Sequence, residues 1–203
     1  MQLPELYVHV IDDEESVLKA CAFLLNSMGY QYKTWSDSLE FLRLTDLHST
    51  AVVITDLRMP NIDGEHLVQH LNNSKSTLGV IVLTGHGDVD TAVKLLKNGI
   101  VDFLQKPVEA KNLAESISTA WQYSLNAFRD WNNFKIYDSL NSKEKNILNL
   151  IVSGYSNKEA ASSMHLSVRS IEVYRANLLD KFACKHLTQL VRIIEQLKDR
   201  YKI

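Results

Sequence analysis

The 203-residue sequence has few residues that interrupt or cross-link a chain: three prolines, seven glycines and two cysteines. Cys21 and Cys184 lie far apart and form no metal-ligand spacing, so we expect two reduced structural thiols. No apolar run approaches the length of a membrane span, and the N-terminus lacks the basic and apolar regions of a signal peptide. These absences predict a cytoplasmic protein with no membrane partner.

The composition that remains, 45% hydrophobic and 23% charged, is typical of a globular protein of one large or two ordinary domains. The net charge of −2 is unevenly divided. Residues 1–125 hold 9 basic and 16 acidic residues, a net charge of −7, and residues 126–203 hold 13 and 8, a net charge of +5. An acidic front half and a basic rear half indicate separate partners, a cation in front and a polyanion behind.

The front half alternates short apolar runs with amphipathic stretches. The runs, which we expect to be strands, cover residues 6–11, 30–35, 51–55, 79–84 and 101–105. Helical patterns cover residues 14–28, 37–44, 64–73 and 88–98, and a fifth begins near Glu109. Several strands are almost continuously apolar, which is typical of parallel strands covered on both faces. The pattern predicts an α/β fold with a doubly wound, five-stranded parallel sheet.

The rear half is all-helical, with helices expected over residues 142–152, 157–164, 168–182 and 187–200. Asn141 and Ser156 are each followed three residues later by glutamate, which predicts two capping boxes, and Ser167 is a third expected cap. Leu125, Phe128 and Trp131 continue the spacing of the fifth helix. We therefore divide the chain into a first domain (1–123), a partly helical linker (124–138) and a small all-α domain (139–203).

Three aspartates stand where predicted strands end: Asp12 and Asp13 after the first, and Asp56 after the third. With strand order 2-1-3-4-5 these ends are neighbours at the crevice where ligands bind. Three converging carboxylates repel one another unless a cation intervenes, and oxygen-only ligands suit Mg²⁺. A carboxylate beside Mg²⁺ can attack a phosphoryl donor and become an aspartyl phosphate.

Two further residues complete this chemistry. Thr84 ends the fourth strand and Lys106 follows the fifth, so a hydroxyl and an ammonium can each meet a phosphoryl oxygen. Each residue alone is weak evidence, because an aspartate at a strand end is more often a turn former or helix cap. The informative observation is that these five residues occur together, at the carboxyl ends of the first, third, fourth and fifth strands.

Four stretches carry a resemblance to a known family: residues 10–14, 56–64, 84–88 and 102–107. They are similar to receiver domains, specifically the FixJ-type branch, and the match covers about residues 5–122. The resemblance implies a flavodoxin-like (CheY-like) fold in which Asp56 accepts a phosphoryl group from a sensor histidine kinase. It implies that Asp13, Asp56 and the backbone carbonyl of Arg58 bind Mg²⁺ directly, and that Asp12 helps through water.

The same resemblance assigns a switch pair. The hydroxyl of Thr84 would move toward the phosphoryl group and the ring of Phe103 would turn into the space that it leaves. From the residues alone, Phe103 is more readily a core side chain. The family also implies a cis peptide bond between Lys106 and Pro107. Asn61 departs from the glycine frequent in the family, but asparagine tolerates the left-handed backbone.

The rear half has the pattern of a helix-turn-helix, with the turn at Leu166 and Ser167 and a recognition helix from about Val168 to Phe182. A plain helical bundle with a solvated charged face explains this pattern almost as well. Residues 140–144, 154–161 and 166–176, however, resemble the LuxR/FixJ-type effector domain, over about residues 138–200. Lys143 and Tyr174 depart from the arginine and histidine that are common there.

By this resemblance, three residues of the recognition helix face base edges in double-stranded promoter DNA: Glu172, Val173 and Ala176. Five others are candidates for phosphate contacts, which make binding salt-dependent: Asn157, Lys158, Arg169, Arg175 and Lys181. The two resemblances together imply a transcriptional response regulator that forms a homodimer when phosphorylated, through residues 88–105, and contacts RNA polymerase. We do not expect an enzyme, beyond self-phosphotransfer and autodephosphorylation.

Two other functions stay open at this stage. The first is a receiver that acts through protein contacts, with the helical domain as an adaptor. The second is an aspartate-dependent phosphatase of the haloacid dehalogenase type, which needs a second acid where this sequence has Arg58.

Overall fold

The structure is a computed structural model that describes residues 5–85 and 94–203. It divides the chain into two compact units, residues 1–128 and 129–203, which are described separately below. The division falls inside the segment 124–138 that the sequence predicts to be a partly helical linker. That segment is helical, because helix α5 (Ala110–Asp138) continues through it without interruption.

The first unit is built on a five-stranded, all-parallel sheet with the order β2-β1-β3-β4-β5. Its strands are β1 (Tyr7–Ile11), β2 (Gln31–Trp35), β3 (Val52–Asp56), β4 (Gly79–Thr84) and β5 (Asp102–Gln105). β3 and β4 are buried at every position. This explains their unbroken apolar sequences, since a central parallel strand is covered on both faces. The predicted fold class and strand order are confirmed.

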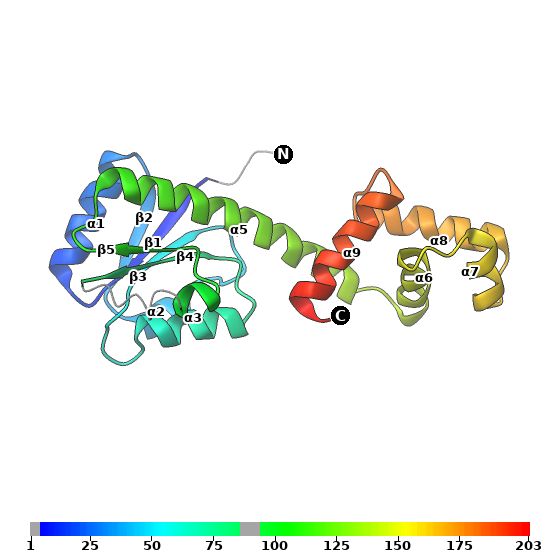
Figure 1. The fold of residues 1–203 in the computed structure, drawn as a ribbon, viewed down its shortest axis with the longest axis horizontal. Coiled ribbons are helices and arrows are strands. Elements are labelled where there is room, and N and C mark those ends of the chain that lie inside the picture. Colours follow the sequence, from blue (N-terminus) through cyan, green and yellow to red (C-terminus); the bar gives the residue numbers. More distant parts are fainter. Residues whose placement is uncertain (1–4, 86–93) are drawn as a thin grey trace. The chain divides into compact units, whose positions relative to one another are not determined.

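Helices cover both faces of this sheet (Figure 1). On one face lie α1 (Glu15–Ser27) and α5, which share a core with the sheet that includes Leu25, Ile54 and Ile117. On the other face lie α2 (Ser38–Leu44) and α3 (Gly64–Asn73), around a second core that includes Phe41 and Leu67. Each helix is amphipathic because it faces the sheet on one side and solvent on the other.

α5 lies directly against the sheet at Gly79. A Cβ at this residue would stand 2.1 Å from the backbone carbonyl oxygen of Ala120, so only glycine permits this approach. Nearby, the hydroxyl of the buried Ser124 accepts a hydrogen bond from the backbone N–H of Ala51 at 3.1 Å. The packing of α5 is therefore fixed by backbone contacts as well as by apolar burial.

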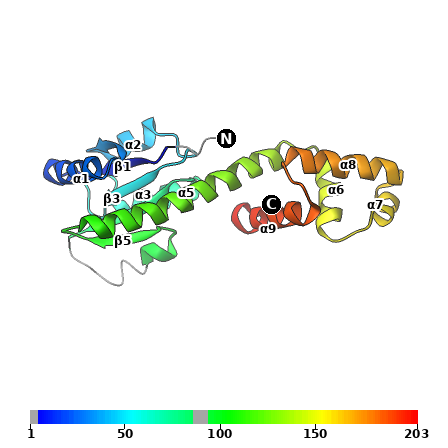
Figure 2. The same cartoon turned by 90° about the horizontal axis from the view of Figure 1, so that it is seen from above.

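The second unit contains α6 (Ser142–Val152), α7 (Asn157–Met164), α8 (Val168–Lys181) and α9 (Leu187–Tyr201) around one apolar core (Figure 2). Both predicted capping boxes are confirmed, at Asn141 with Glu144 and at Ser156 with Glu159. Ser167 caps α8 as expected, by accepting from the backbone N–H of Ser170. These caps satisfy N–H groups that have no partner inside the helix.

The connection between α7 and α8 is a short turn. His165 adopts a left-handed conformation with φ of 53° and ends α7, a position where histidine is tolerated better than most residues. Leu166 and Ser167 follow, as the sequence predicts, and α8 begins at Val168. Ala160 and Ile171 are fully buried where the two helices meet. The result is a helix-turn-helix.

The remaining sequence predictions agree with the structure to within one or two residues at most helix and strand ends. The predicted helix over residues 88–98 lies partly outside the described residues, and residues 94–97 of it are helical. Both cysteines are buried and free of disulfides. Among the described residues, no helix combines the length and apolar character needed to cross a bilayer.

Candidate functional site

The carboxyl ends of β1, β3, β4 and β5 bring the predicted site residues together at one edge of the sheet. Asp12 follows β1 and is 1% exposed, while Asp56 ends β3 and is 8% exposed. Thr84 ends β4 and is also buried. Lys106 follows β5, and its backbone N–H donates to the carbonyl oxygen of Thr84 at 2.7 Å. The edge therefore combines two acids, a hydroxyl and an ammonium.

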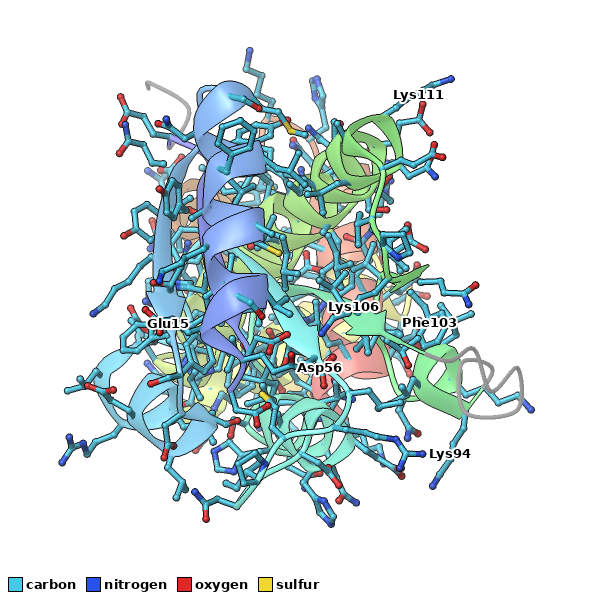
Figure 3. The ribbon with its side chains drawn as sticks, turned by 90° about the vertical axis from the view of Figure 1, so that its left-hand side faces the viewer. Glu15, Asp56, Lys94, Phe103, Lys106 and Lys111 are labelled. Atoms are coloured by element: carbon cyan, nitrogen blue, oxygen red, sulfur yellow. The ribbon has the colours of Figure 1, made fainter. Side chains whose placement is uncertain are left out.

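Lys106 joins the two buried acids, and Figure 3 shows its side chain close to Asp56. Its Nζ lies 2.8 Å from Oδ2 of Asp12 and 2.7 Å from Oδ1 of Asp56. Burial lowers the pKa of Lys106, but hydrogen bonds and charges from both carboxylates outweigh it, so the pKa lies above its usual value. Two carboxylates against one ammonium leave a formal charge of −1, so the cluster still attracts a cation.

The remaining oxygens of both acids accept hydrogen bonds from the backbone. Oδ2 of Asp56 accepts from the N–H of Arg58 at 2.7 Å, and Oδ1 of Asp12 accepts from the N–H of Glu14 at 2.9 Å. The loop after β3 returns over Asp56 to Gly64, where a Cβ would stand 2.4 Å from the backbone oxygen of Asp56. The acids are thus held in fixed orientations before any ligand binds.

Asp56 opens onto a pocket of about 390 Å³. Seven residues line this pocket: Glu14, Asp56, Leu57, Arg58, Thr84, Gly85 and Lys106. The lining offers a carboxylate nucleophile, a hydroxyl donor and an ammonium around a space open to solvent. This combination can receive a phosphoryl group, because donors stand ready for its oxygens.

The same pocket fits Mg²⁺ in charge and in donor chemistry. Asp13, which follows Asp12 in the sequence, is exposed and is not among the residues that line the pocket. In the part of the chain that the structure describes, no three histidine, cysteine, aspartate or glutamate side chains form a ready-made metal cage. Mg²⁺ does not require one, because it usually keeps several waters and takes only one or two carboxylates together with substrate phosphate. The oxygen donors and the surplus negative charge meet that requirement.

Of the two predicted switch residues, Thr84 lines this pocket and Phe103 lies on β5. Phe103 on β5 is half-buried and packs against the core under α2 and α3. Its backbone N–H donates to Oδ1 of Asp102 at 2.8 Å, and the hydroxyl of Ser116 on α5 donates to the other carboxylate oxygen of Asp102. The peptide bond between Lys106 and Pro107 is cis, as the family resemblance implies. β5 is thereby hydrogen-bonded to α5.

A second candidate site is the outer face of α8. Ile171 and Leu178 are buried against α6 and α7, so the helix turns its opposite face to solvent. That face includes the three predicted base-facing residues, all exposed: Glu172, Val173 and Ala176. Lys158 on α7 and Arg169 on α8 are exposed as well. An exposed second helix of a helix-turn-helix is the element that enters the major groove of DNA.

Three of the predicted phosphate-contacting residues already have partners within the protein. Arg175 donates to the side-chain oxygen of Asn157 at 2.6 Å, which links α8 to α7. Lys181 forms an ion pair of 2.7 Å with Glu144 on α6. The structure thus brings Asn157 and Arg175 together and sets Lys181 apart, whereas Lys158 and Arg169 form no ion pair with any of the described residues.

Sequence reasoning missed the contacts that hold these sites in place. Gly64 and Ser116 received no role, and the pairing of Glu144 with Lys181 had no detectable signal, because 37 residues separate them. The Asn141 capping box did single out Glu144, but only as a helix cap. Gly64 could have been singled out, since it follows an aspartate cap at the start of a helix, where glycine otherwise weakens the helix.

Comparisons with known proteins divide the chain into the same two parts, a front domain and a rear helical domain. A model of response regulator receiver domains matches residues 8–118, and a model of bacterial regulatory proteins of the luxR family matches residues 138–194. The first match alone covers more than half of the chain.

Several relatives match nearly the full length. The tetrathionate response regulatory protein TtrR of Salmonella typhimurium is 40% identical over 190 residues, which span 94% of this chain and 92% of TtrR. The transcriptional regulatory protein FixJ of Rhizobium meliloti is 37% identical, with 92% of this chain and 93% of FixJ covered. The crystal structure of full-length FixJ from B. japonicum is similar with a TM-score of 0.54 and 34% identity, covering 92% and 94% of the two chains.

Proposed function

This chain belongs to the response regulators that join a receiver domain to a luxR-family DNA-binding domain, and from this premise we propose that Asp56 is its phosphoryl acceptor. As a member of that family it is a transcriptional response regulator of a two-component system. Its output is DNA binding, so it is not an enzyme in the ordinary sense. Membership also implies a sensor kinase as the partner of the receiver and DNA as the partner of the second domain.

One observation supports Asp56 above the other acids. It is the buried carboxylate that both lines the 390 Å³ pocket and contacts Lys106, at 2.7 Å. Asp12 is buried more deeply and does not line the pocket, and Asp13 is exposed. Glu14 also lines the pocket, but it is exposed and forms no ion pair with Lys106, so Asp56 is the pocket acid that is held in place to receive a phosphoryl group.

The transfer is a displacement at phosphorus. An oxygen of Asp56 forms the new bond while the bond from phosphorus to a histidine nitrogen of the kinase breaks, and that nitrogen then takes up a proton. Lys106, cationic because its pKa is raised, pairs with one phosphoryl oxygen, and the hydroxyl of Thr84 donates to another. The N–H of Arg58 keeps the second oxygen of Asp56 in place during the transfer.

The proposal includes Mg²⁺ at this site. Asp13, Asp56 and the backbone carbonyl of Arg58 would bind the ion, with Asp12 acting through water. Bound there, Mg²⁺ supplies positive charge that offsets the phosphoryl oxygens.

Phosphorylation then changes the receiver face near β5. Thr84 moves toward the new group, and Phe103 turns inward from its half-buried position. Two receivers then associate through residues 88–105, of which 94–105 lie within the described residues. The dimer contacts RNA polymerase once it is on DNA.

For the second domain, we propose that α8 enters the major groove, with Glu172, Val173 and Ala176 toward the bases. Lys158 and Arg169 contact phosphates. Lys181 leaves Glu144 and pairs with a DNA phosphate instead. Arg175 and Asn157 fix the angle between α7 and α8 and also contact the DNA backbone. The basic side chains around this face favour strong binding to phosphates. The base-facing residues include few polar groups, so we expect few sequence-specific hydrogen bonds.

The experiment that tests the receiver half is size-exclusion chromatography of the full chain with Mg²⁺ and a small acyl-phosphate donor, together with intact-mass analysis. The variants are Asp56→Asn and, as a matched control, Asp46→Asn, which removes an exposed carboxylate of the same domain. We expect a phosphoryl adduct and a shift to dimer in the wild type and in Asp46→Asn. Asp56→Asn should show neither. An adduct on Asp56→Asn would contradict the assignment.

No observation favours the two alternative functions. Arg58 occupies the position of the second acid of a haloacid dehalogenase, is exposed, and contacts Asp56 through its backbone N–H. The match of residues 138–194 to the luxR family supports DNA binding rather than an adaptor role.

A further inference from the structure

The first three turns of α8 present a mixed face to solvent. Val168 and Val173 are 40% and 54% exposed, and Arg169, Glu172 and Ala176 are exposed beside them. In a helix-turn-helix the N-terminal part of the second helix contacts base edges. Glu172 is the only acid in residues 168–177. A carboxylate at the centre of a DNA-binding face therefore requires an explanation.

The presence of Glu172 on this face is not explained by a role in stabilising the fold. Among the residues that the structure describes, it takes part in no hydrogen bond or ion pair and belongs to no apolar core. The arginine one turn later, Arg175, donates to Asn157 on α7 instead. Arg169, one turn earlier, forms no ion pair with Glu172 in the described part of the chain. The carboxylate thus remains available to a ligand.

DNA makes an unpaired carboxylate unfavourable at this position. The duplex carries about one negative charge per 1.7 Å, so a glutamate in the groove is repelled unless a base donates a hydrogen bond to it. In the major groove guanine presents only acceptors, and thymine presents an acceptor and a methyl group. Adenine places the acceptor N7 beside its amino group, whereas cytosine presents its N4 amino group alone.

We propose that Glu172 is a specificity-determining residue that selects a cytosine in each half-site through the N4 amino group. This inference rests on the proposed entry of α8 into the major groove. Glu172 contributes less to affinity than to discrimination, because guanine and thymine offer its carboxylate no donor and adenine places the acceptor N7 beside its amino group. Phosphate contacts by Lys158 and Arg169 supply the affinity.

The test is selection of binding sites from a random double-stranded DNA library by the full chain, with Mg²⁺ and an acyl-phosphate donor, followed by sequencing. The variants are Glu172→Gln, Glu172→Ala and Asp180→Asn. Asp180 is an exposed acid two turns further along the same helix, so this control removes the same charge away from the bases.

We expect the wild type and Asp180→Asn to select a half-site with one position where cytosine is preferred by at least about fivefold. Glu172→Gln should change that position to adenine, because glutamine pairs with N6 and N7 of adenine. Glu172→Ala should lose the preference there and bind unrelated DNA more tightly, which a purely structural residue would not cause.

Identical base preferences in the wild type and Glu172→Gln would overturn the inference and leave DNA binding itself intact. A position that responds to Glu172→Gln but prefers another base in the wild type would overturn the assignment of cytosine. If the wild type enriches no sequence at all, the proposed function of the second domain fails together with the inference.

Discussion

Lys106 shows how much of the receiver pocket depends on one residue. It is the cation that contacts both Asp12 and Asp56, which are 1% and 8% exposed. A buried charge without a partner costs several kcal/mol, so loss of Lys106 destabilises the pocket as well as its chemistry. Because its pKa lies above the usual value for lysine, Lys106 stays protonated at neutral pH. The pocket is therefore ready for a phosphoryl group throughout the neutral pH range.

His9 is the second residue whose charge state matters. It is 8% exposed on β1 among the rings of Tyr7, Trp35 and Phe41, and its Nδ1 accepts a hydrogen bond from Nε1 of Trp35 at 3.1 Å. Burial, helped by the charge of Lys33, lowers the pKa of His9 from 6.5 to about 4. Folding therefore favours the neutral ring.

The receiver should lose stability in mild acid because of His9. Above pH 6.5 the ring is neutral in both states, so the full contribution to stability is present; it is lost as the pH falls from 6.5 toward 4, where only the unfolded chain binds the proton. The total loss is at most about 3 kcal/mol. Urea unfolding of the wild type and His9→Val at several pH values measures it. The difference between the two proteins should change only in this window, and a constant difference would contradict the assignment.

At the scale of elements, the junction between β3 and α3 determines where Asp56 points. The backbone N–H of Gly64 donates to the carbonyl oxygen of Leu57 at 2.9 Å, which closes the loop over the end of β3. A methyl group at Gly64 would overlap the backbone of Asp56 and Leu57, so strand and helix would have to separate. This junction couples the start of α3 to Asp56, the proposed phosphoryl acceptor.

Gly64→Ala should therefore destabilise the receiver by about 1–3 kcal/mol and slow phosphorylation of Asp56. Gly85→Ala is the matched control: Gly85 lines the same pocket, but a Cβ there meets nothing within 4 Å. Both substitutions restrict the unfolded chain equally. The difference between their free energies of unfolding therefore measures the steric clash at residue 64. The measurements are urea unfolding and the rate of adduct formation with an acyl phosphate. Equal behaviour of the two variants would show that the loop relaxes freely.

Sequence periodicity predicted the elements well and their side-chain contacts poorly, for a physical reason. β4 and α3 were predicted at both ends because burial of one face fixes the pattern of apolar residues. The pairing of Lys181 with Glu144 depends on the packing of α6 against α8, which no local pattern encodes. Lys143 and Tyr174, two departures from the family, face each other with Nζ 5.5 Å from the ring centre. The residue type at either position alone does not predict this contact.

The candidate site was predictable to the same extent. Parallel strands end at one edge of a sheet, so Asp12, Asp56, Thr84 and Lys106 could be placed together from strand order alone. That Lys106 bridges the acids, while Asp13 faces solvent, depends on side-chain orientation. The sequence does not contain that information in any periodic form.

At the scale of the whole molecule, charge separates two functions along one chain. Residues 1–125 carry a net charge of −7 and residues 126–203 a net charge of +5. The acidic part contains the candidate Mg²⁺ pocket, and the basic part contains the exposed face of α8. Net repulsion between the front half and DNA limits non-specific binding, which leaves the contacts of the second domain to set affinity.

DNA affinity should therefore fall steeply with salt, and the slope should report the phosphate contacts. Lys158→Ala and Arg169→Ala should each weaken binding on all sequences and reduce the slope of log affinity against log salt by about 1. Lys19→Ala, which removes an exposed lysine of α1, is the control. Fluorescence anisotropy with labelled DNA at several salt concentrations measures the slopes. An unchanged slope in Lys158→Ala or Arg169→Ala would remove that residue from the interface.

The hydrogen bond between Arg175 and Asn157 has a thermodynamic consequence for this interface. It fixes α8 against α7 in the protein without DNA, across a buried contact that includes Ala160 and Ile171. A hinged pair of helices would lose conformational entropy when it docks, and that loss would be subtracted from the binding free energy. Here the ordering has already taken place during folding. In the proposed complex, α8 therefore meets DNA preorganised, and the free energy of its contacts is available for discriminating among sequences.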